Sequence, residues 1–219
     1  MKHIKFILIN LLLGLAVTSH SQEIRSAYFT IADYRSGIQQ IELEINDFLV
    51  VMDGQANLLF TEPNHRSGHP NAFKDLEYSP DGRLRGKDGV KIEYYDDFDK
   101  NKAGKIKSIN GIPLDYYSNF DIHEEPGRLK SIGKISFKYH NAFDIHDEQG
   151  SLKSLGSISL KYYTAFDIHD QKGNVKSIGP VSITWFNSFD QAPAKGRVKS
   201  IKGNTSAIYV AKVIEGRAS

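Results

Sequence analysis

The 219-residue chain contains no cysteine, one tryptophan and two methionines. The absence of cysteine excludes disulfide bonds, thiol catalysis and a lipid-anchored N-terminal cysteine, so core packing must hold the fold. An excess of one charge sign is also missing, because 28 basic residues are balanced by 26 acidic ones. This balance argues against nucleic acid or an anionic membrane surface as the partner.

Long apolar runs are scarce, and the run at Ile7–Val17 is too short to cross a bilayer comfortably. Lysines precede this run, and the small residues Ser19 and Ser21 follow it, as in a secretory signal peptide cleaved before Gln22. An N-terminal membrane anchor is the alternative. We therefore expect a periplasmic or secreted protein that is not a lipoprotein and makes no stable membrane insertion after cleavage. Without residues 1–21, basic and acidic residues are equal in number.

The chain is rich in internal repetition, because a unit of about 23 residues occurs five times between Val90 and Gly203. A Phe-Asp pair recurs in every unit, as Phe98-Asp99, Phe120-Asp121, Phe143-Asp144, Phe166-Asp167 and Phe189-Asp190. Glycine and lysine recur in step, as Gly104 and Lys107, Gly127 and Lys130, Gly150 and Lys153, Gly173 and Lys176, and Gly196 and Lys199. A fixed period of this length indicates a repeat architecture in which neighbouring units bury each other's apolar faces.

One unit reads as a β-hairpin. Apolar residues between Lys134 and His146 alternate with polar ones, which predicts a strand with one buried face. Asp147–Gly150 suits a tight turn whose glycine has a positive φ, and Ser151–Leu155 then forms a return strand. This register places Ile145 opposite Leu152 and Asp144 opposite Lys153, so the Asp and Lys columns would mark the register.

Repetition of this hairpin predicts an all-β fold. Ten or more antiparallel strands with one apolar face should form a curled meander sheet or a closed barrel. A β-solenoid with 23-residue coils is the alternative. We favour tandem antiparallel hairpins because Asp-x-x-Gly is a hairpin signal.

We expect one domain with atypical ends. Residues 22–89 read as degenerate repeats forming an N-terminal cap, with a polar loop insert at residues 61–73 and a degenerate copy at Tyr78–Gly86. Residues 90–203 hold the five repeats. Residues 204–219 supply a closing strand and a tail.

The repeats resemble tandem hairpins of the YD/RHS kind and, more loosely, the MORN-like repeats of secreted bacterial proteins. The segments Gly82-Arg83-Leu84 and Gly127-Arg128-Leu129 are similar to the Gly-Arg-Leu of the YD pattern. The chain departs from that pattern at His123, His146 and His169, where a tyrosine would stand. The resemblance implies a hairpin-repeat sheet in a secreted protein, and it implies no activity.

Three units contain an Asp-x-His pair, namely Asp121 and His123, Asp144 and His146, and Asp167 and His169. Asp and His two apart on a strand project to the same side, so each pair could offer oxygen and nitrogen ligands to a divalent metal. A closed metal site needs three or four converging ligands. The alternative is that these are exposed polar residues beside turns.

An aromatic column offers a second candidate site, formed by Tyr95, Tyr117, His140, Tyr163 and Phe186. It lies on the strand face opposite a second aromatic column, formed by Tyr94, Tyr116, Tyr139, Tyr162 and Trp185. An exposed aromatic stripe would bind a glycan or an extended peptide. A buried cross-strand ladder would instead stabilise the sheet.

The sequence contains no nucleophile elbow, phosphate-binding loop or zinc-ligand spacing. Catalytic sites usually break a repeat's symmetry, and the unique residues here read as turn formers. We therefore expect no catalysis and no cofactor. The predicted function is that of a structural or ligand-binding module, with divalent-metal binding as the alternative, and the oligomeric state is open.

Overall fold

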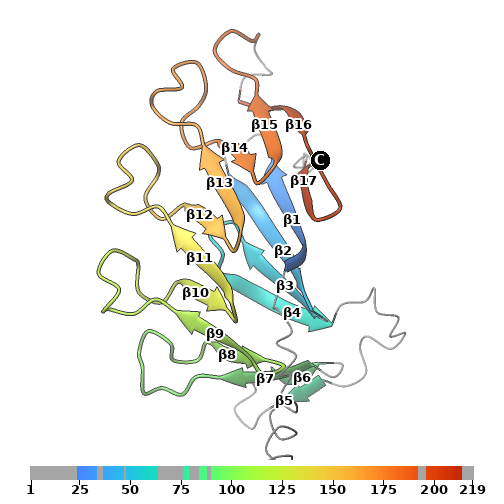
Figure 1. Ribbon diagram of the computed structural model, residues 1–219, viewed down its shortest axis with the longest axis vertical. Coiled ribbons are helices and arrows are strands. Elements are labelled where there is room, and N and C mark those ends of the chain that lie inside the picture. The colour runs from blue at the N-terminus through green and yellow to red at the C-terminus, as the bar shows by residue number, and fades with distance from the viewer. Residues whose placement is uncertain are drawn as a thin grey trace, which may run out of the picture.

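The structure, a computed structural model, describes residues 24–33, 37–46, 48–63, 76–78, 84–87, 90–191 and 196–213. The predicted signal peptide and most of the predicted insert lie outside these ranges. The described elements are seventeen β-strands in two sheets, one of five strands and one of twelve (Figure 1). Within the described ranges, no helix is long and apolar enough to span a bilayer.

The smaller sheet has the strand order β17-β1-β2-β3-β4. Its strands are β1 (Ile24–Ala32), β2 (Ile38–Ile45), β3 (Phe48–Asp53), β4 (Leu58–Pro63) and β17 (Ile208–Val213). β1 to β4 are antiparallel neighbours, whereas β17 runs parallel to β1. The two ends of the described chain therefore pair with each other.

The larger sheet is a meander in which each strand pairs with its neighbours in sequence. Its strands are β5 (Leu76–Tyr78), β6 (Leu84–Lys87), β7 (Val90–Tyr94), β8 (Ile106–Ile109), β9 (Ile112–Tyr116), β10 (Leu129–Ile132), β11 (Ile135–Tyr139), β12 (Leu152–Leu155), β13 (Ile158–Tyr162), β14 (Val175–Ile178), β15 (Val181–Trp185) and β16 (Val198–Lys202). The prediction of an all-β fold built from tandem antiparallel hairpins is confirmed. Antiparallel pairing of consecutive strands excludes the solenoid for these residues.

The hairpins differ in detail from the predicted ones. The strand predicted over residues 134–146 is wrong beyond Tyr139, because β11 ends there and Tyr139 pairs with Leu152. Residues 140–151 form a long loop between β11 and β12. The tight turns lie at the opposite edge, where Ile132 pairs with Ile135 across two residues and Gly133 has a φ of 56°.

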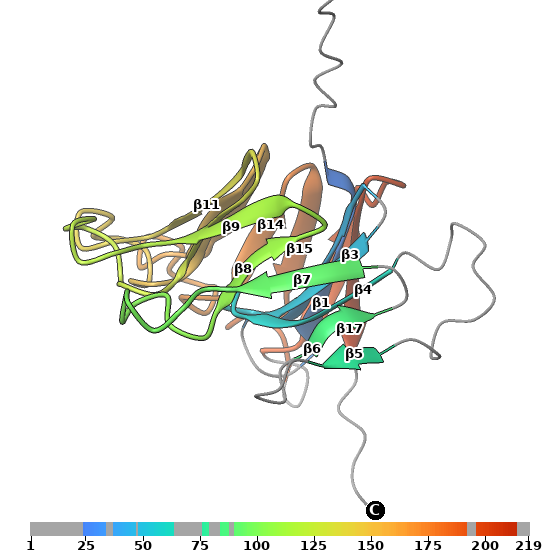
Figure 2. The ribbon, with the colours of Figure 1, turned by 90° about the horizontal axis from the view of Figure 1, so that it is seen from below.

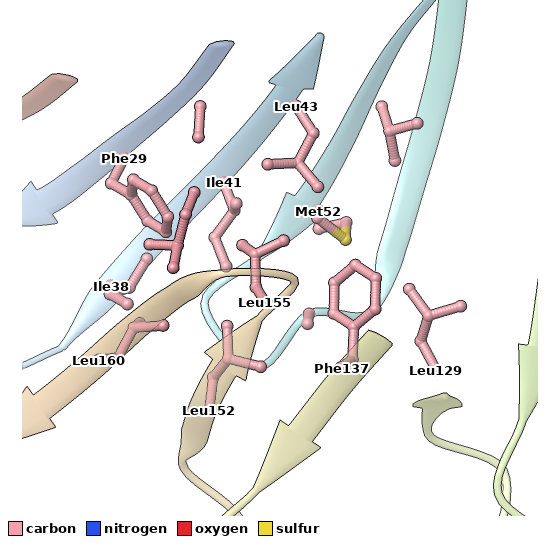
Figure 3. Close-up of a cluster of buried hydrophobic side chains, with 14 of the residues drawn as sticks. Phe29, Ile38, Ile41, Leu43, Met52, Leu129, Phe137, Leu152, Leu155 and Leu160 are labelled. Atoms are coloured by element: carbon pink, nitrogen blue, oxygen red, sulfur yellow. The ribbon is translucent and has the colours of Figure 1, made fainter. Parts of the chain in front are cut away.

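The twelve-stranded sheet does not curl as we expected. Its apolar face is covered by the five-stranded sheet, so it need not close on itself to exclude water (Figure 2). Figure 3 shows Ile41, Leu43 and Met52 of the smaller sheet facing Phe137 and Leu155 of the larger one. All five side chains are fully buried. The core of the molecule therefore lies between the two sheets.

Buried polar groups also connect the sheets. Asp33, at the end of β1, is buried and accepts hydrogen bonds from Arg197 at 2.6 Å and Lys212 at 3.2 Å. Burial acts to raise the pKa of Asp33, but these two cations lower it overall. The ion pairs fix the C-terminal hairpin and β17 against β1.

Candidate functional site

The loops after β9, β11 and β13 share one backbone arrangement, which is fixed by hydrogen bonds within each loop. In the loop between β11 and β12, the Asp144 amide donates to the Asn141 carbonyl and the Asp147 amide donates to the Asp144 carbonyl, both at 3.0 Å. The Gly150 amide closes the loop by donating to the His140 carbonyl at 2.7 Å. Gly150 has a φ of 83°, as expected for the glycine of this turn. The loop tips are therefore held in place by their own backbone.

The aspartate column stabilises these loops. Asp144 Oδ2 accepts the Asn141 amide at 3.1 Å, and Asp144 Oδ1 lies 2.6 Å from Lys153 Nζ. The same ion pair recurs as Asp121–Lys130, Asp167–Lys176 and Asp190–Lys199, at 2.8, 2.7 and 3.0 Å. The predicted Asp–Lys pairs therefore form, but the loop brings them together and not the predicted strand register.

These contacts lower the pKa of each aspartate. The Lys130 hydrogen bond, followed by the Ser118 amide, lowers the pKa of Asp121 to about 2. Lys153 lowers the pKa of Asp144, and Lys176 lowers that of Asp167, in the same way. A carboxylate with both oxygens engaged by the chain itself has a structural role in the loop.

The Asp-x-His pairs do not converge on a metal site. The His123 ring packs against the Phe143 ring of the next loop, with 4.8 Å between centroids. His146 and His169 repeat this contact with Phe166 and Phe189, at 4.6 and 4.2 Å. Across the described residues, no group of three or more His, Asp or Glu side chains is arranged to hold a metal ion.

The predicted aromatic stripe is not an exposed surface. Tyr117 and Tyr163 are 8% and 9% exposed, His140 is also buried, and Tyr95 and Phe186 are half-buried. The Tyr117 hydroxyl donates to the Phe137 carbonyl of the next hairpin at 2.8 Å. The Tyr95 and Tyr163 hydroxyls reach equivalent carbonyls, those of Leu114 and Ile183, at 2.8 and 3.3 Å. The column is therefore a structural ladder that links successive hairpins.

The aromatic column on the opposite strand face also donates hydrogen bonds between strands, but to the preceding strand in the sequence. Four of its members donate to a carbonyl of the preceding return strand, namely Tyr116 to Ile106, Tyr139 to Leu129, Tyr162 to Leu152 and Trp185 to Val175, at 2.8 to 3.0 Å. Successive hairpins such as β10 and β11 share only two backbone residue pairs. The aromatic donors thus supply hydrogen bonds where the backbone ladder ends.

One position interrupts the ladder. His140 occupies a tyrosine position, and neither of its ring nitrogens makes a hydrogen bond, although Nδ1 lies 3.5 Å from Asp144 and 3.6 Å from Asp147. Phe186 follows β15 in the last hairpin of the sheet, so it has no next hairpin to reach. The ladder is therefore weakest at the unit of His140.

A polar cleft lies where the loops meet the turn after β3, and Gln55, Arg128 and Glu148 line it. Arg128 is buried, donates to the carbonyls of Gly150 and Gln55 at 2.5 and 2.9 Å, and lies 3.6 Å above the Tyr139 ring. The guanidinium is thus engaged in holding the loops against the smaller sheet.

A row of exposed apolar side chains lies at the loop tips. We call it the loop-tip ridge, and its eight members are Phe98, Phe120, Ile122, Phe143, Ile145, Phe166, Ile168 and Phe189. Their exposed fractions run from 71% for Phe143 to 95% for Phe98 and Phe120. The loops that carry them project from one edge of the larger sheet (Figures 1 and 2). The His–Phe ring contacts connect four neighbouring loops into one surface.

Sequence reasoning missed this ridge because Phe143 and Ile145 continue the parity of the core residues Phe137 and Tyr139. The structure shows that the strand has already ended there. A signal was present, since Asn141 and Asp144 flank Phe143, and such residues favour local turns over a strand.

Comparison with known proteins gives no matching family model, no similar curated sequence and no similar solved structure. The resemblance to YD/RHS or MORN-like repeats therefore stays a prediction.

Proposed function

We propose that this chain is an exported, non-catalytic β-repeat protein that docks a polypeptide partner through the loop-tip ridge. The observation that carries the proposal is the exposure of eight large apolar side chains on adjacent loops. Five phenylalanines exposed to this degree present at least roughly 500 Å² of apolar surface. The largest apolar patch of a typical monomer is about 300–600 Å² and is often functional.

The ridge is not needed by the fold. The core is filled by other residues, and the loop backbone is fixed by Asp144 and its equivalents. The phenylalanines at the tips fill no part of the core, and in three loops their ring contacts the histidine of the preceding loop while most of the side chain stays exposed. The repetition of phenylalanine in all five units therefore favours an interaction role.

A polypeptide fits this surface better than a glycan does. The eight ridge side chains are hydrocarbon and offer no hydrogen bond, whereas sugar hydroxyls lose hydration on docking and need polar partners. A peptide presenting apolar side chains meets the ridge without that cost.

Peptide-display selection against the mature protein tests the proposal. We expect apolar peptides that bind the wild type and lose at least tenfold in affinity for the Phe143→Ser/Phe166→Ser variant. The matched control is Leu59→Ser/Phe60→Ser, which removes two exposed apolar side chains of β4, away from the loops in Figure 1. Peptides that bind the ridge variant as tightly as the wild type would refute the proposal.

A further inference from the structure

We infer that the occupant of the loop-tip ridge is the ridge of a second copy of this chain, in a two-fold symmetric dimer. The inference rests on the proposed function and names the partner at the same site. It is carried by the size of the ridge, its preformed loops and its period.

The size of the ridge suits a dimer. Its eight side chains expose an area on the order of the roughly 800 Å² that each partner contributes to a standard protein interface. Association can therefore bury enough apolar surface without contribution from any other part of the molecule.

The loops are already ordered before docking. The Asn141–Asp144 and Asp144–Asp147 turns fix the backbone, and the Lys153 ion pair ties the loop to the sheet. A preformed surface avoids the entropic cost of ordering a loop on binding, which for many partners offsets much of the gain from apolar burial.

The period of the ridge identifies its partner. Equivalent loops are two strands apart, which sets their spacing at roughly 9 to 10 Å. An unrelated protein would have to match this spacing over five loops, whereas a second copy matches it by construction. Antiparallel docking about a two-fold axis makes one patch complementary to itself, which is the commonest form of homodimer.

This symmetry fixes which loops meet. Phe143 belongs to the third of the five loops and lies at the axis. Phe120 then faces Phe166 of the other copy, and Phe98 faces Phe189. The ridge side chains are uncharged, and the loop aspartates such as Asp144 are already paired with lysines. Salt weakens contacts between exposed charges, so an apolar dimer interface should persist at high salt.

The absence of cysteine allows a clean crosslinking test. Single variants Phe143→Cys and Leu59→Cys are oxidised at equal concentration, and the second serves as a control because Leu59 is exposed on β4. We expect disulfide-linked dimers at least tenfold faster for Phe143→Cys. A mixture of Phe120→Cys and Phe166→Cys should give the heterodimer in preference to either homodimer. Equal rates for the first two variants, or random pairing in the mixture, would overturn the inference.

Sedimentation equilibrium of the wild type provides a measurement free of substitutions near the axis. A monomer–dimer equilibrium that persists from 50 to 500 mM NaCl supports the inference, and Phe120→Ser/Phe166→Ser should abolish it with an unchanged melting temperature. A wild type that stays monomeric while the ridge still selects peptides would refute the dimer and leave the proposed function standing. A monomer that instead binds zwitterionic phosphatidylcholine vesicles through the ridge would refute both and assign the ridge to a lipid surface.

Discussion

Tyr117 and Phe120 lie three residues apart in one repeat, and both columns recur at the same period. Tyr117 is 8% exposed and donates its hydroxyl to the next hairpin, whereas Phe120 is 95% exposed at a loop tip. The difference lies in position relative to the end of β9. Tyr117 directly follows β9, so its side chain still lies beside the neighbouring strands and can reach their carbonyls. Phe120 lies in the loop, where the backbone groups form hydrogen bonds within the loop itself. Periodicity alone therefore does not separate a structural column from an exposed one.

The largest expected effect comes from comparing two phenylalanine-to-alanine substitutions, one in a strand and one in a loop. Phe137→Ala removes a fully buried side chain and should lower the free energy of unfolding by about 3–5 kcal/mol. Phe143→Ala, six residues later, should change it by no more than about 0.5 kcal/mol. Urea unfolding measures both. Similar losses for the two variants would show that Phe143 belongs to the core.

The tyrosine ladder predicts a smaller effect. Tyr117→Phe removes the donor to the Phe137 carbonyl and keeps the ring, so the free energy of unfolding should fall by about 1 kcal/mol. Tyr209→Phe, at an exposed position on β17, should have less effect than this. If the Tyr117 variant unfolds like the wild type, the hydroxyl does not stabilise the contact between hairpins.

His140 offers the reverse experiment. His140→Tyr restores the residue type found at Tyr117 and Tyr163, and its hydroxyl should reach a carbonyl of the next hairpin. We expect a gain of about 0.5–1 kcal/mol in the free energy of unfolding, because an unpaired buried imidazole is also removed. His123→Tyr, at an exposed loop position, is the control and should change little. A loss of stability in His140→Tyr would mean that the imidazole is specifically accommodated.

The loop aspartates predict the smallest effect, because their ion pairs are partly exposed. Contacts with lysine and the loop amides lower the pKa values of Asp121, Asp144, Asp167 and Asp190. A carboxyl group whose pKa is lower in the folded state stabilises the fold above its unfolded pKa and ceases to do so as pH falls through its folded pKa. Stability should therefore decline from about pH 4 towards pH 2, the pKa of Asp121.

The Asp121→Asn variant tests whether Asp121 contributes to this decline in stability. The variant should be less stable than the wild type at pH 7 and should lose less on acidification, as measured by thermal unfolding at pH 2 to 7. Asp97→Asn, at an exposed position of the first loop, is the matched control. An equal decline in all three proteins would assign the acid effect to other carboxylates.

The antiparallel hairpin sheet could be predicted because alternation within Ile135–Tyr139 and the glycine at Gly150 are local signals. The end of the strand could not, because Phe143 and Ile145 keep the alternation while Asn141 and Asp144 turn the chain. The second sheet, which covers the apolar face, could not be predicted either. It includes the pairing of β17 with β1, and these two strands are far apart in the sequence.

The candidate site was misplaced for a related reason. Tyr117 and Tyr163 were candidates because they recur, but their hydroxyls meet carbonyls that only the sheet geometry brings within reach. The loop-tip ridge was hidden among residues that we assigned to the core. The turn-forming residues near Phe143, and not the repeat period, distinguish the exposed loop-tip ridge from the buried aromatic column.

The central claim is that the phenylalanines of the loops face solvent while those of the strands fill the core. Fluorine NMR of protein labelled with fluorophenylalanine, in the presence of a soluble paramagnetic agent and at a concentration that keeps the protein monomeric, tests it directly. The resonances of Phe98, Phe120, Phe143, Phe166 and Phe189 should broaden strongly, and those of Phe29, Phe48 and Phe137 should not. Protection of the loop resonances in the monomer would contradict the claim and return these side chains to the fold.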